Sequence, residues 1–156
     1  MRAMSTRIFL IRHGATVLTA EDRFAGATDV ELSDEGREQA RLLGERLSTE
    51  KIAAVYASPL GRTVETAGLI AEPHGLEVQL RDGLREIAHG HWEQMTRREV
   101  DEKFPAEAAA WGEDPYTVAR VGGERGLGGT ARSCPGQPAS GRRQRGGAAR
   151  GASPQA

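Results

Sequence analysis

The sequence predicts an α/β fold in which helices flank a mostly parallel sheet as three layers. Short apolar runs alternate with stretches of helical periodicity, and turn-forming residues separate them. The chain of 156 residues has the length of one domain. The apolar pattern stops after Val121, so we expect the fold to be incomplete on its C-terminal side.

The first elements are a strand, a loop and a helix. Residues 7–11 are predicted to form a buried strand, because four apolar residues follow one another there. Residues 15–32 are small and polar enough for a loop. Ser33 then suits the cap of a helix, and two acidic residues follow it in the first turn. The buried face of this helix should hold Gly36, Ala40, Leu43 and Leu47.

A second strand and helix are predicted next. Residues 52–57 form a short apolar run, and Ser58-Pro59 is typical of a helix start, with serine as the cap and proline in the first turn. This helix should end near residues 73–75. A third strand is predicted over residues 77–80, and a helix over residues 96–111 with a kink or break near Pro105.

The composition changes at residue 122. Residues 122–156 contain ten glycines, no aromatic residue and a single large aliphatic, Leu127. Such a segment cannot bury enough apolar area to offset its ordering entropy, so we expect a disordered tail after a domain portion at residues 1–121. Seven arginines and one glutamate lie in residues 120–156, yet the lack of aromatics and of regular Arg-Gly repeats argues against nucleic-acid binding.

The number of cysteines and the first ten residues indicate the cellular compartment. Cys134 is the single cysteine, which excludes an internal disulfide and fits a reducing environment. The first ten residues contain an apolar run too short for a signal peptide or a membrane span. These observations predict a cytoplasmic protein that does not bind a membrane, and they indicate no oligomeric state.

Several charged residues follow predicted strands, at the sheet edge where ligands bind in α/β proteins. Arg12 and His13 follow the first strand, and an arginine beside an imidazole suits a phosphate pocket. Arg62 lies in the first turn of a helix, whose N-terminus attracts phosphate. Glu86 follows the third strand and has the chemistry of a proton donor. Taken alone, each of these residues could equally be part of an ordinary solvated surface.

The order of motifs resembles the histidine phosphatase superfamily, also called the phosphoglycerate-mutase-like family. The resemblance covers residues 7–124 and rests on six strings in order. They are Ile11-Arg12-His13-Gly14, Arg23-Phe24-Ala25-Gly26, Leu32-Ser33-Asp34-Glu35-Gly36, Ala57-Ser58-Pro59-Leu60-Gly61-Arg62, Arg85-Glu86-Ile87 and Gly122-Gly123-Glu124.

The resemblance implies roles for individual residues. His13 would be the nucleophile that forms a phosphohistidine, and Glu86 would protonate the leaving group. Arg12 and Arg62 would bind the phosphoryl oxygens. Neither a metal ion nor an organic cofactor would take part. The substrate side would be lined by a loop containing Arg23 and Gly26, with Thr19 nearby, while His89 and His91 would lie at the rim.

The sequence also departs from the family pattern. Thr19 stands where an asparagine is common, and Ala25 where a small hydroxyl residue is common. The family has a second catalytic histidine at the end of a later core strand, but this chain has no histidine after His91. We therefore expect the C-terminal part of the domain to be missing, and we interpret the tail as a frameshifted or mis-annotated end.

The function predicted from the resemblance is hydrolysis of a phosphomonoester on a small phosphorylated metabolite. Residues 90–96 resemble the Gly-x-Trp-Glu-Gly-x-Thr stretch of the phosphatase branch. Two alternatives stay open. One is phosphoryl transfer of the phosphoglycerate mutase type, and the other is a truncated remnant without catalytic activity.

Overall fold

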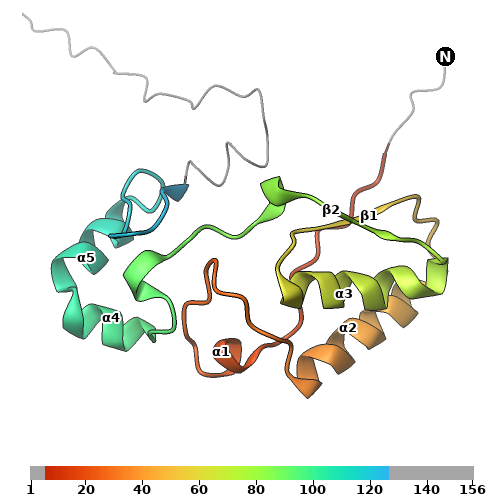
Figure 1. The fold of residues 1–156 in the computed structure, drawn as a ribbon, viewed down its shortest axis with the longest axis horizontal. Helices are drawn as coiled ribbons and strands as arrows, with labels where there is room; N and C mark the ends of the chain where they lie inside the picture. Colours follow the sequence, from red (N-terminus) through yellow and green to blue (C-terminus); the bar gives the residue numbers. More distant parts are fainter. Residues whose placement is uncertain (1–5, 127–156) are drawn as a thin grey trace, which may run out of the picture.

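The structure is a computed structural model that describes residues 6–126. Two groups of helices lie at opposite ends of this part of the chain (Figure 1). One end holds α2 (Asp34–Leu47), α3 (Gly61–Ala71) and a small sheet, and the other holds α4 (Arg97–Lys103) and α5 (Pro105–Glu113). The 3₁₀ turn η1 (Glu72–His74) joins α3 to the second strand within the first end. The other short elements are α1 (Val17–Ala20) and two 3₁₀ turns, η2 (Asp82–Leu84) and η3 (Gly90–Trp92).

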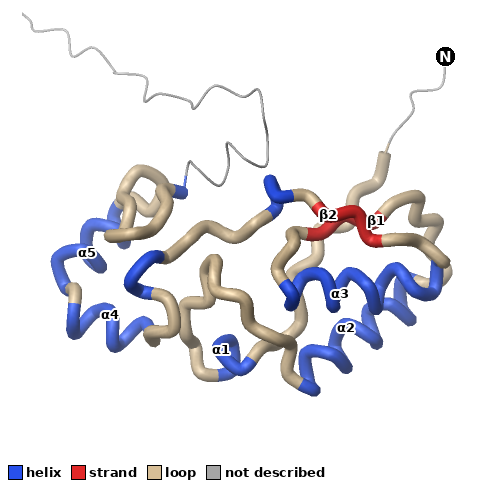
Figure 2. Tube along the Cα trace, in the orientation of Figure 1, coloured by secondary structure: helices blue, strands red, loops and turns tan. Residues whose placement is uncertain are grey.

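The sheet consists of two parallel strands. β1 (Val55–Ala57) pairs with β2 (Val78–Leu80), with Val55 opposite Val78. The strands are shorter than predicted, but their parallel pairing through a helical crossover is confirmed. Helix α3 packs against both strands, and α2 packs against α3 (Figure 2).

Helix α2 follows its sequence prediction. The Ser33 hydroxyl accepts a hydrogen bond from the Gly36 N–H at 3.1 Å, which satisfies one of the free donors of the first turn. Acidic residues occupy that turn and Arg46 occupies the last, so both ends match the helix dipole. The buried face is formed by Gly36, Ala40, Gly44 and Leu47, whereas Leu43, which was predicted on this face, is only half-buried.

Helix α3 begins two residues later than predicted. Its N-cap is Leu60, which makes no side-chain capping bond, so the prediction that Ser58 caps this helix is wrong. The Ser58 hydroxyl instead lies 2.7 Å from that of Thr63. The capping oxygen comes from a distant loop, because the Asp29 carboxylate accepts the Gly61 N–H at 2.7 Å. The helix ends as predicted, with Gly75 in the left-handed region at φ 62°.

The predicted first strand at residues 7–11 is not formed. Ile8 is 74% exposed and Leu10 95% exposed, and no backbone hydrogen bond joins residues 7–11 to any other described segment. A strand needs a partner segment for its N–H and C=O groups, and within residues 6–126 no segment is hydrogen-bonded to the backbone of residues 7–11. The segment instead borders an open groove of about 660 Å³, whose far wall is Leu43, Arg46, Leu47 and Glu50.

A second apolar cluster organises the other end of the molecule. Trp92, Val100 and Ala108 are buried there, and Phe24, Met95, Phe104 and Trp111 pack against them. The predicted break near Pro105 is confirmed, because α4 stops at Lys103 and Pro105 opens α5. A capping box between Thr96 and Glu99 begins α4.

The start of the predicted tail belongs to this second end. The Glu124 N–H donates to the Ala88 carbonyl at 2.8 Å, and the Ala88 N–H donates to the Glu124 carboxylate at 3.1 Å. The rest of the segment predicted to be disordered, residues 127–156, lies outside the described residues. No helix among residues 6–126 has the length and apolar character that crossing a bilayer requires.

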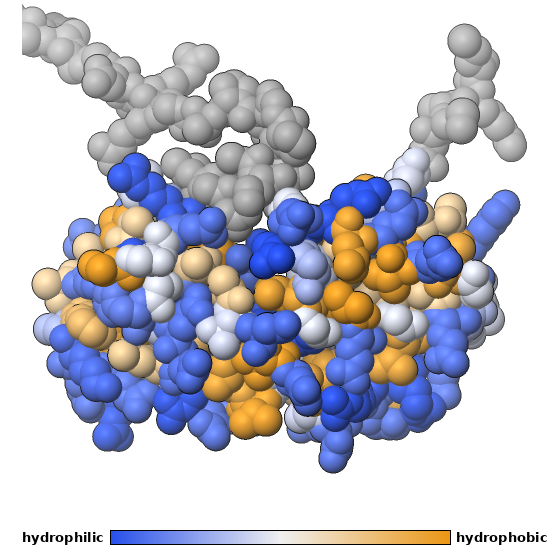
Figure 3. Space-filling model, viewed as in Figure 1, coloured by the Kyte–Doolittle hydropathy of each residue, from blue (hydrophilic) through white to orange (hydrophobic). Residues whose placement is uncertain are grey.

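Part of the surface over the two strands is apolar. Apolar patches interrupt the charged surface over the end that carries β1 and β2 (Figure 3). Tyr56 of β1 is 52% exposed and Leu80 of β2 is 49% exposed, so part of the strand surface is not covered by described residues. The structure is thus a parallel α/β arrangement that is incomplete, as the sequence predicts.

Candidate active site

The turn at residues 12–14 is fixed by contacts with both α2 and α3. The Gly14 N–H donates to the Thr66 hydroxyl at 3.1 Å, and this hydroxyl donates to the Arg62 carbonyl at 2.7 Å. On the other side, a Cβ on Gly14 would lie 2.2 Å from the Gly36 carbonyl oxygen. Only two glycines permit so close an approach of backbone to helix. The turn therefore holds His13 near the N-terminus of α3.

His13 is half-buried, and one of its ring nitrogens is occupied. Its Nδ1 lies 2.8 Å from the Gly14 carbonyl oxygen, and a carbonyl only accepts, so Nδ1 carries the hydrogen. The lone pair of the neutral ring is then on Nε2. Burial lowers the pKa of His13, and the charges of Arg62 and Arg12 lower it further, against opposing effects of the Gly14 bond and Glu86.

Arg62 is a buried cation held by backbone carbonyls. It is 1% exposed, and its two terminal nitrogens donate to the Thr28 and Gly26 carbonyls at 2.7 and 2.8 Å. Its Nε has no hydrogen-bond partner. Carbonyl acceptors carry no net charge, so the guanidinium keeps its positive charge available for an anion.

Glu86 and Arg12 complete the predicted group. Glu86 is exposed, and its carboxylate influences the pKa values of both His13 and Arg62, so it lies within electrostatic range of each. Arg12 is exposed and adjacent to His13, and its charge also affects the His13 pKa. The charges of Arg12, Arg62 and Glu86 thus all act on the His13 imidazole.

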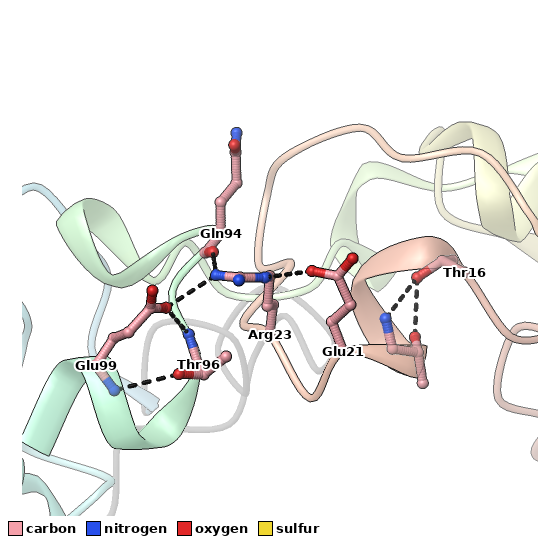
Figure 4. A network of polar contacts seen from close by, with 7 residues as sticks. Thr16, Glu21, Arg23, Gln94, Thr96 and Glu99 are labelled. Atoms are coloured by element: carbon pink, nitrogen blue, oxygen red, sulfur yellow. Dashed lines mark hydrogen bonds and ion pairs between the residues drawn. The ribbon is translucent and has the colours of Figure 1, made fainter.

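In the loop predicted to line the substrate side, the Arg23 side chain is held by bonds within the protein. The Arg23 guanidinium binds the Glu21 carboxylate, the Gln94 carbonyl and the Glu99 carboxylate at 2.6, 2.7 and 2.8 Å (Figure 4). Arg23 therefore joins two loops and the start of α4. Thr19 is exposed, and its hydroxyl lies 2.9 Å from that of Thr16. Gly26 alone of the three contacts the Arg62 side chain.

The two histidines predicted at the rim have defined partners. His89 Nδ1 accepts a hydrogen bond from the Arg120 guanidinium at 2.7 Å, and burial together with the Arg120 charge lowers the His89 pKa. His91 Nδ1 lies 2.9 Å from the Val121 carbonyl. Arg120 itself is 1% exposed and lies over the rings of Trp92 and Trp111, with its guanidinium 5.4 Å from each.

Sequence reasoning missed three residues that shape the site. Thr66 links the His13 turn to α3, Asp29 caps α3, and Glu93 binds the loop that holds Arg62. Asp29 also occupies the Gly61 N–H, one of the donors expected to attract phosphate. The position of Glu93 in the Trp-Glu motif is the one signal in the sequence that marks any of the three.

Gln94 adopts a backbone conformation that side chains disfavour, with φ at 67°. It stands where the phosphatase-branch pattern has glycine. We expect Gln94→Gly to raise the free energy of unfolding by about 0.5–1 kcal/mol, since relief of the left-handed strain exceeds the entropic cost of glycine. Chemical denaturation would measure the change. The control is Gln79→Gly in β2, where the backbone is extended, and it should lower the free energy of unfolding. A lower free energy of unfolding for both variants would contradict this account.

Comparison with known proteins gives the same family as the motifs. The sequence model of the histidine phosphatase superfamily (branch 1) matches residues 8–135. Phosphoserine phosphatase 1 of Hydrogenobacter thermophilus is 42% identical over 118 residues, which are 76% of this chain and 56% of that protein. Glucosyl-3-phosphoglycerate phosphatase of Mycobacterium tuberculosis is 36% identical over 129 residues, 83% of this chain and 57% of that protein.

Comparison with solved structures leads to the same family. The mycobacterial glucosyl-3-phosphoglycerate phosphatase in complex with VO3 superposes with a TM-score of 0.71 at 35% identity, over 78% of this chain and 60% of that one. The chain therefore spans somewhat more than half the length of the relatives it matches. The family match, the identities and the shared fold together show that this chain belongs to branch 1 of the histidine phosphatase superfamily.

Proposed function

We propose that the chain carries the phosphate-binding and nucleophilic part of a phosphomonoester hydrolase that works through a phosphohistidine on His13. The observation that carries this proposal is the state of His13. Its Nδ1 hydrogen is used by the Gly14 carbonyl, and its pKa is lowered by burial and by two arginines, so a neutral Nε2 is available near the buried cation of Arg62.

In the first step, the Nε2 lone pair of His13 attacks phosphorus and the bond from phosphorus to the ester oxygen breaks. The protonated Glu86 carboxyl gives its proton to the departing oxygen, which leaves as an alcohol. Arg62 and Arg12 offset the negative charge on the remaining phosphoryl oxygens. The Gly14 carbonyl stabilises the positive charge that the ring acquires, because it accepts the Nδ1 hydrogen.

In the second step, water attacks phosphorus and gives a proton to the Glu86 carboxylate. The phosphorus–nitrogen bond breaks, its electron pair returns to Nε2, and inorganic phosphate leaves. Each group ends in its starting state, so neither step requires a redox partner.

The substrate is proposed at the level of class. Relatives are named for phosphoserine and for glucosyl-3-phosphoglycerate, both of them small phosphorylated metabolites. We propose the same class for this chain. The predicted cytoplasmic location follows from the sequence alone and remains a prediction.

The test of this function is to measure phosphate release from p-nitrophenyl phosphate and, in parallel, the interconversion of 2- and 3-phosphoglycerate. Hydrolysis predicts phosphate release without interconversion. Interconversion without net phosphate release would favour the mutase alternative and overturn the hydrolase proposal.

One observation favours the inactive alternative. The apolar run at residues 8–11 is exposed. A remnant would show neither phosphate release nor a labelled histidine above the background of a His13→Ala variant. A folded chain that gives either signal, dependent on His13, would exclude this alternative.

The titration of His13 should report its environment directly. We expect its midpoint below 6.5, because burial and the neighbouring arginines favour the neutral ring. The nucleophilic form should then persist at pH 6.5 and be lost only as pH falls through the lowered pKa. NMR of the histidine Cε1–H signals, assigned with His13→Ala, would measure this. A midpoint above 6.5 would contradict the proposed electrostatics.

A further inference from the structure

The orientation of Arg62 depends on one short loop. Both terminal nitrogens of its guanidinium donate to carbonyls of this loop, at Gly26 and Thr28. The side chain is buried, so water cannot replace these acceptors if the loop moves. Whatever fixes the loop at residues 26–28 therefore fixes the direction of the guanidinium.

The Glu93 carboxylate holds the same loop from the opposite side. Its Oε1 accepts the N–H groups of Ala27 and His89, each at 3.0 Å, and its Oε2 accepts the Thr28 hydroxyl. Burial opposes ionisation of Glu93, but these three hydrogen bonds outweigh it and lower its pKa, so the group stays a carboxylate. The loop thus lies between an anion that binds its donors and a cation that binds its acceptors.

The Glu93 carboxylate packs closely against the loop at Gly26. Gly26 has φ at 53°, and a Cβ there would lie 2.6 Å from Glu93 Oε1 and 2.9 Å from a ring carbon of His89. Backbone pairing continues beside it, since the Gln94 N–H donates to the Phe24 carbonyl at 2.7 Å. The Arg23 guanidinium bridges the same two segments (Figure 4).

We propose that Glu93 is a positioning residue for phosphate binding, which acts on Arg62 through the loop at residues 26–28. The carboxylate fixes the amide of Ala27 and the hydroxyl of Thr28, and the loop carbonyls then hold the Arg62 guanidinium toward the anion. This inference rests on the proposed function, because it takes Arg62 as a phosphate ligand.

A positioning role of Glu93 and a purely electrostatic role predict opposite changes in phosphate affinity when its charge is removed. The Glu93 charge acts on Arg62, so its neutralisation would make the site more positive and tighten phosphate binding if charge alone mattered. If Glu93 positions the loop, neutralisation should weaken binding, because a misdirected guanidinium loses its contact with the anion.

The experiment measures the affinity of the full chain for inorganic phosphate by calorimetry, together with the Tm of each variant. We expect Glu93→Gln to weaken phosphate binding by about ten-fold or more. Thr28→Val, which removes a donor to Glu93 without changing charge, should weaken binding in the same direction and serves if Glu93→Gln does not fold. The matched control is Glu107→Gln, because Glu107 is also a partly buried carboxylate that binds a loop, at the Val121 N–H.

The outcomes separate the two proposals. The positioning role is supported if Glu93→Gln and Thr28→Val bind phosphate more weakly than the parent. Glu107→Gln must then bind phosphate as the parent does, although its Tm falls by a similar amount. If both test variants bind phosphate as tightly as the parent or more tightly, the positioning role is overturned and the hydrolase proposal stands. The same conclusion follows if Glu107→Gln weakens phosphate binding as much as the test variants do. A parent chain that neither binds phosphate nor releases it from p-nitrophenyl phosphate overturns both.

Discussion

Replacement of His13 by alanine is expected to lower phosphate release from p-nitrophenyl phosphate by about 10⁴-fold or more. The methyl group of alanine cannot form the covalent intermediate, and Arg62 and Arg12 can only bind the ester. Phosphate binding should survive, because the guanidinium of Arg62 is held by Gly26 and Thr28 and not by the imidazole. Steady-state kinetics and calorimetry with inorganic phosphate would measure the two effects.

A second histidine provides the control. His74 lies in the turn that ends α3, away from the residues that affect the His13 pKa. His74→Ala should keep the parental rate. Equal rates for the parent and for His13→Ala would show that any phosphate release comes from another source and that His13 is not the nucleophile.

Substitution of Glu86 by glutamine should give a loss that depends on the leaving group. An alkyl phosphate needs a proton on its departing oxygen, so its hydrolysis should slow by about 10²–10⁴-fold. p-Nitrophenolate leaves without a proton, so the loss on p-nitrophenyl phosphate should be less than about ten-fold. Because Glu86 is exposed and its side chain accepts one local bond, from the Ile87 N–H, the fold should be unaffected.

The comparison of the two substrates isolates the proton transfer. Glu77→Gln, an exposed carboxylate just before β2, is the matched control and should hydrolyse both esters at the parental rate. If Glu86→Gln slowed both esters equally, Glu86 would act on binding or folding, and the proton donor would have to be sought elsewhere.

Local signals in the sequence were sufficient for α2, α4 and α5, but not for α1, which lies in a segment predicted to be a loop. The Ser33 cap and the recurrence of small and apolar residues placed α2, and Pro105 marked the break between α4 and α5. The parallel pairing of β1 and β2 also followed, because a strand, a helix and a strand in succession favour a parallel crossover.

Features that depend on distant partners were not predictable in this way. Residues 7–11 have the composition of a buried strand, but a strand requires a hydrogen-bonded partner, and none of the described segments pairs with them. Ser58 has the composition of a cap, yet Asp29 reaches the helix start from 32 positions away and takes that role. Neither outcome is encoded in the few residues around the motif.

The candidate site shows the same division. Arg12, His13, Arg62 and Glu86 were named from short motifs, and the charges of the other three all affect the pKa of His13. Glu93 and Thr66 were missed, because each acts through hydrogen bonds to backbone groups of a loop or turn more than 50 positions away. The assignment of Arg23 to the substrate side stays a prediction; its partners among the described residues are Glu21, the Gln94 carbonyl and Glu99.

The central claim is that the described part of this chain presents a neutral, nucleophilic His13 to a bound phosphoryl group. The most direct test is to incubate the full chain with ³²P-labelled phosphomonoester, quench in alkali, and map the label by peptide mass spectrometry. The account predicts an acid-labile, alkali-stable label on the peptide that contains His13, absent from His13→Ala and present in His74→Ala. A chain that is folded by circular dichroism and binds phosphate, but carries no label on His13, would contradict it.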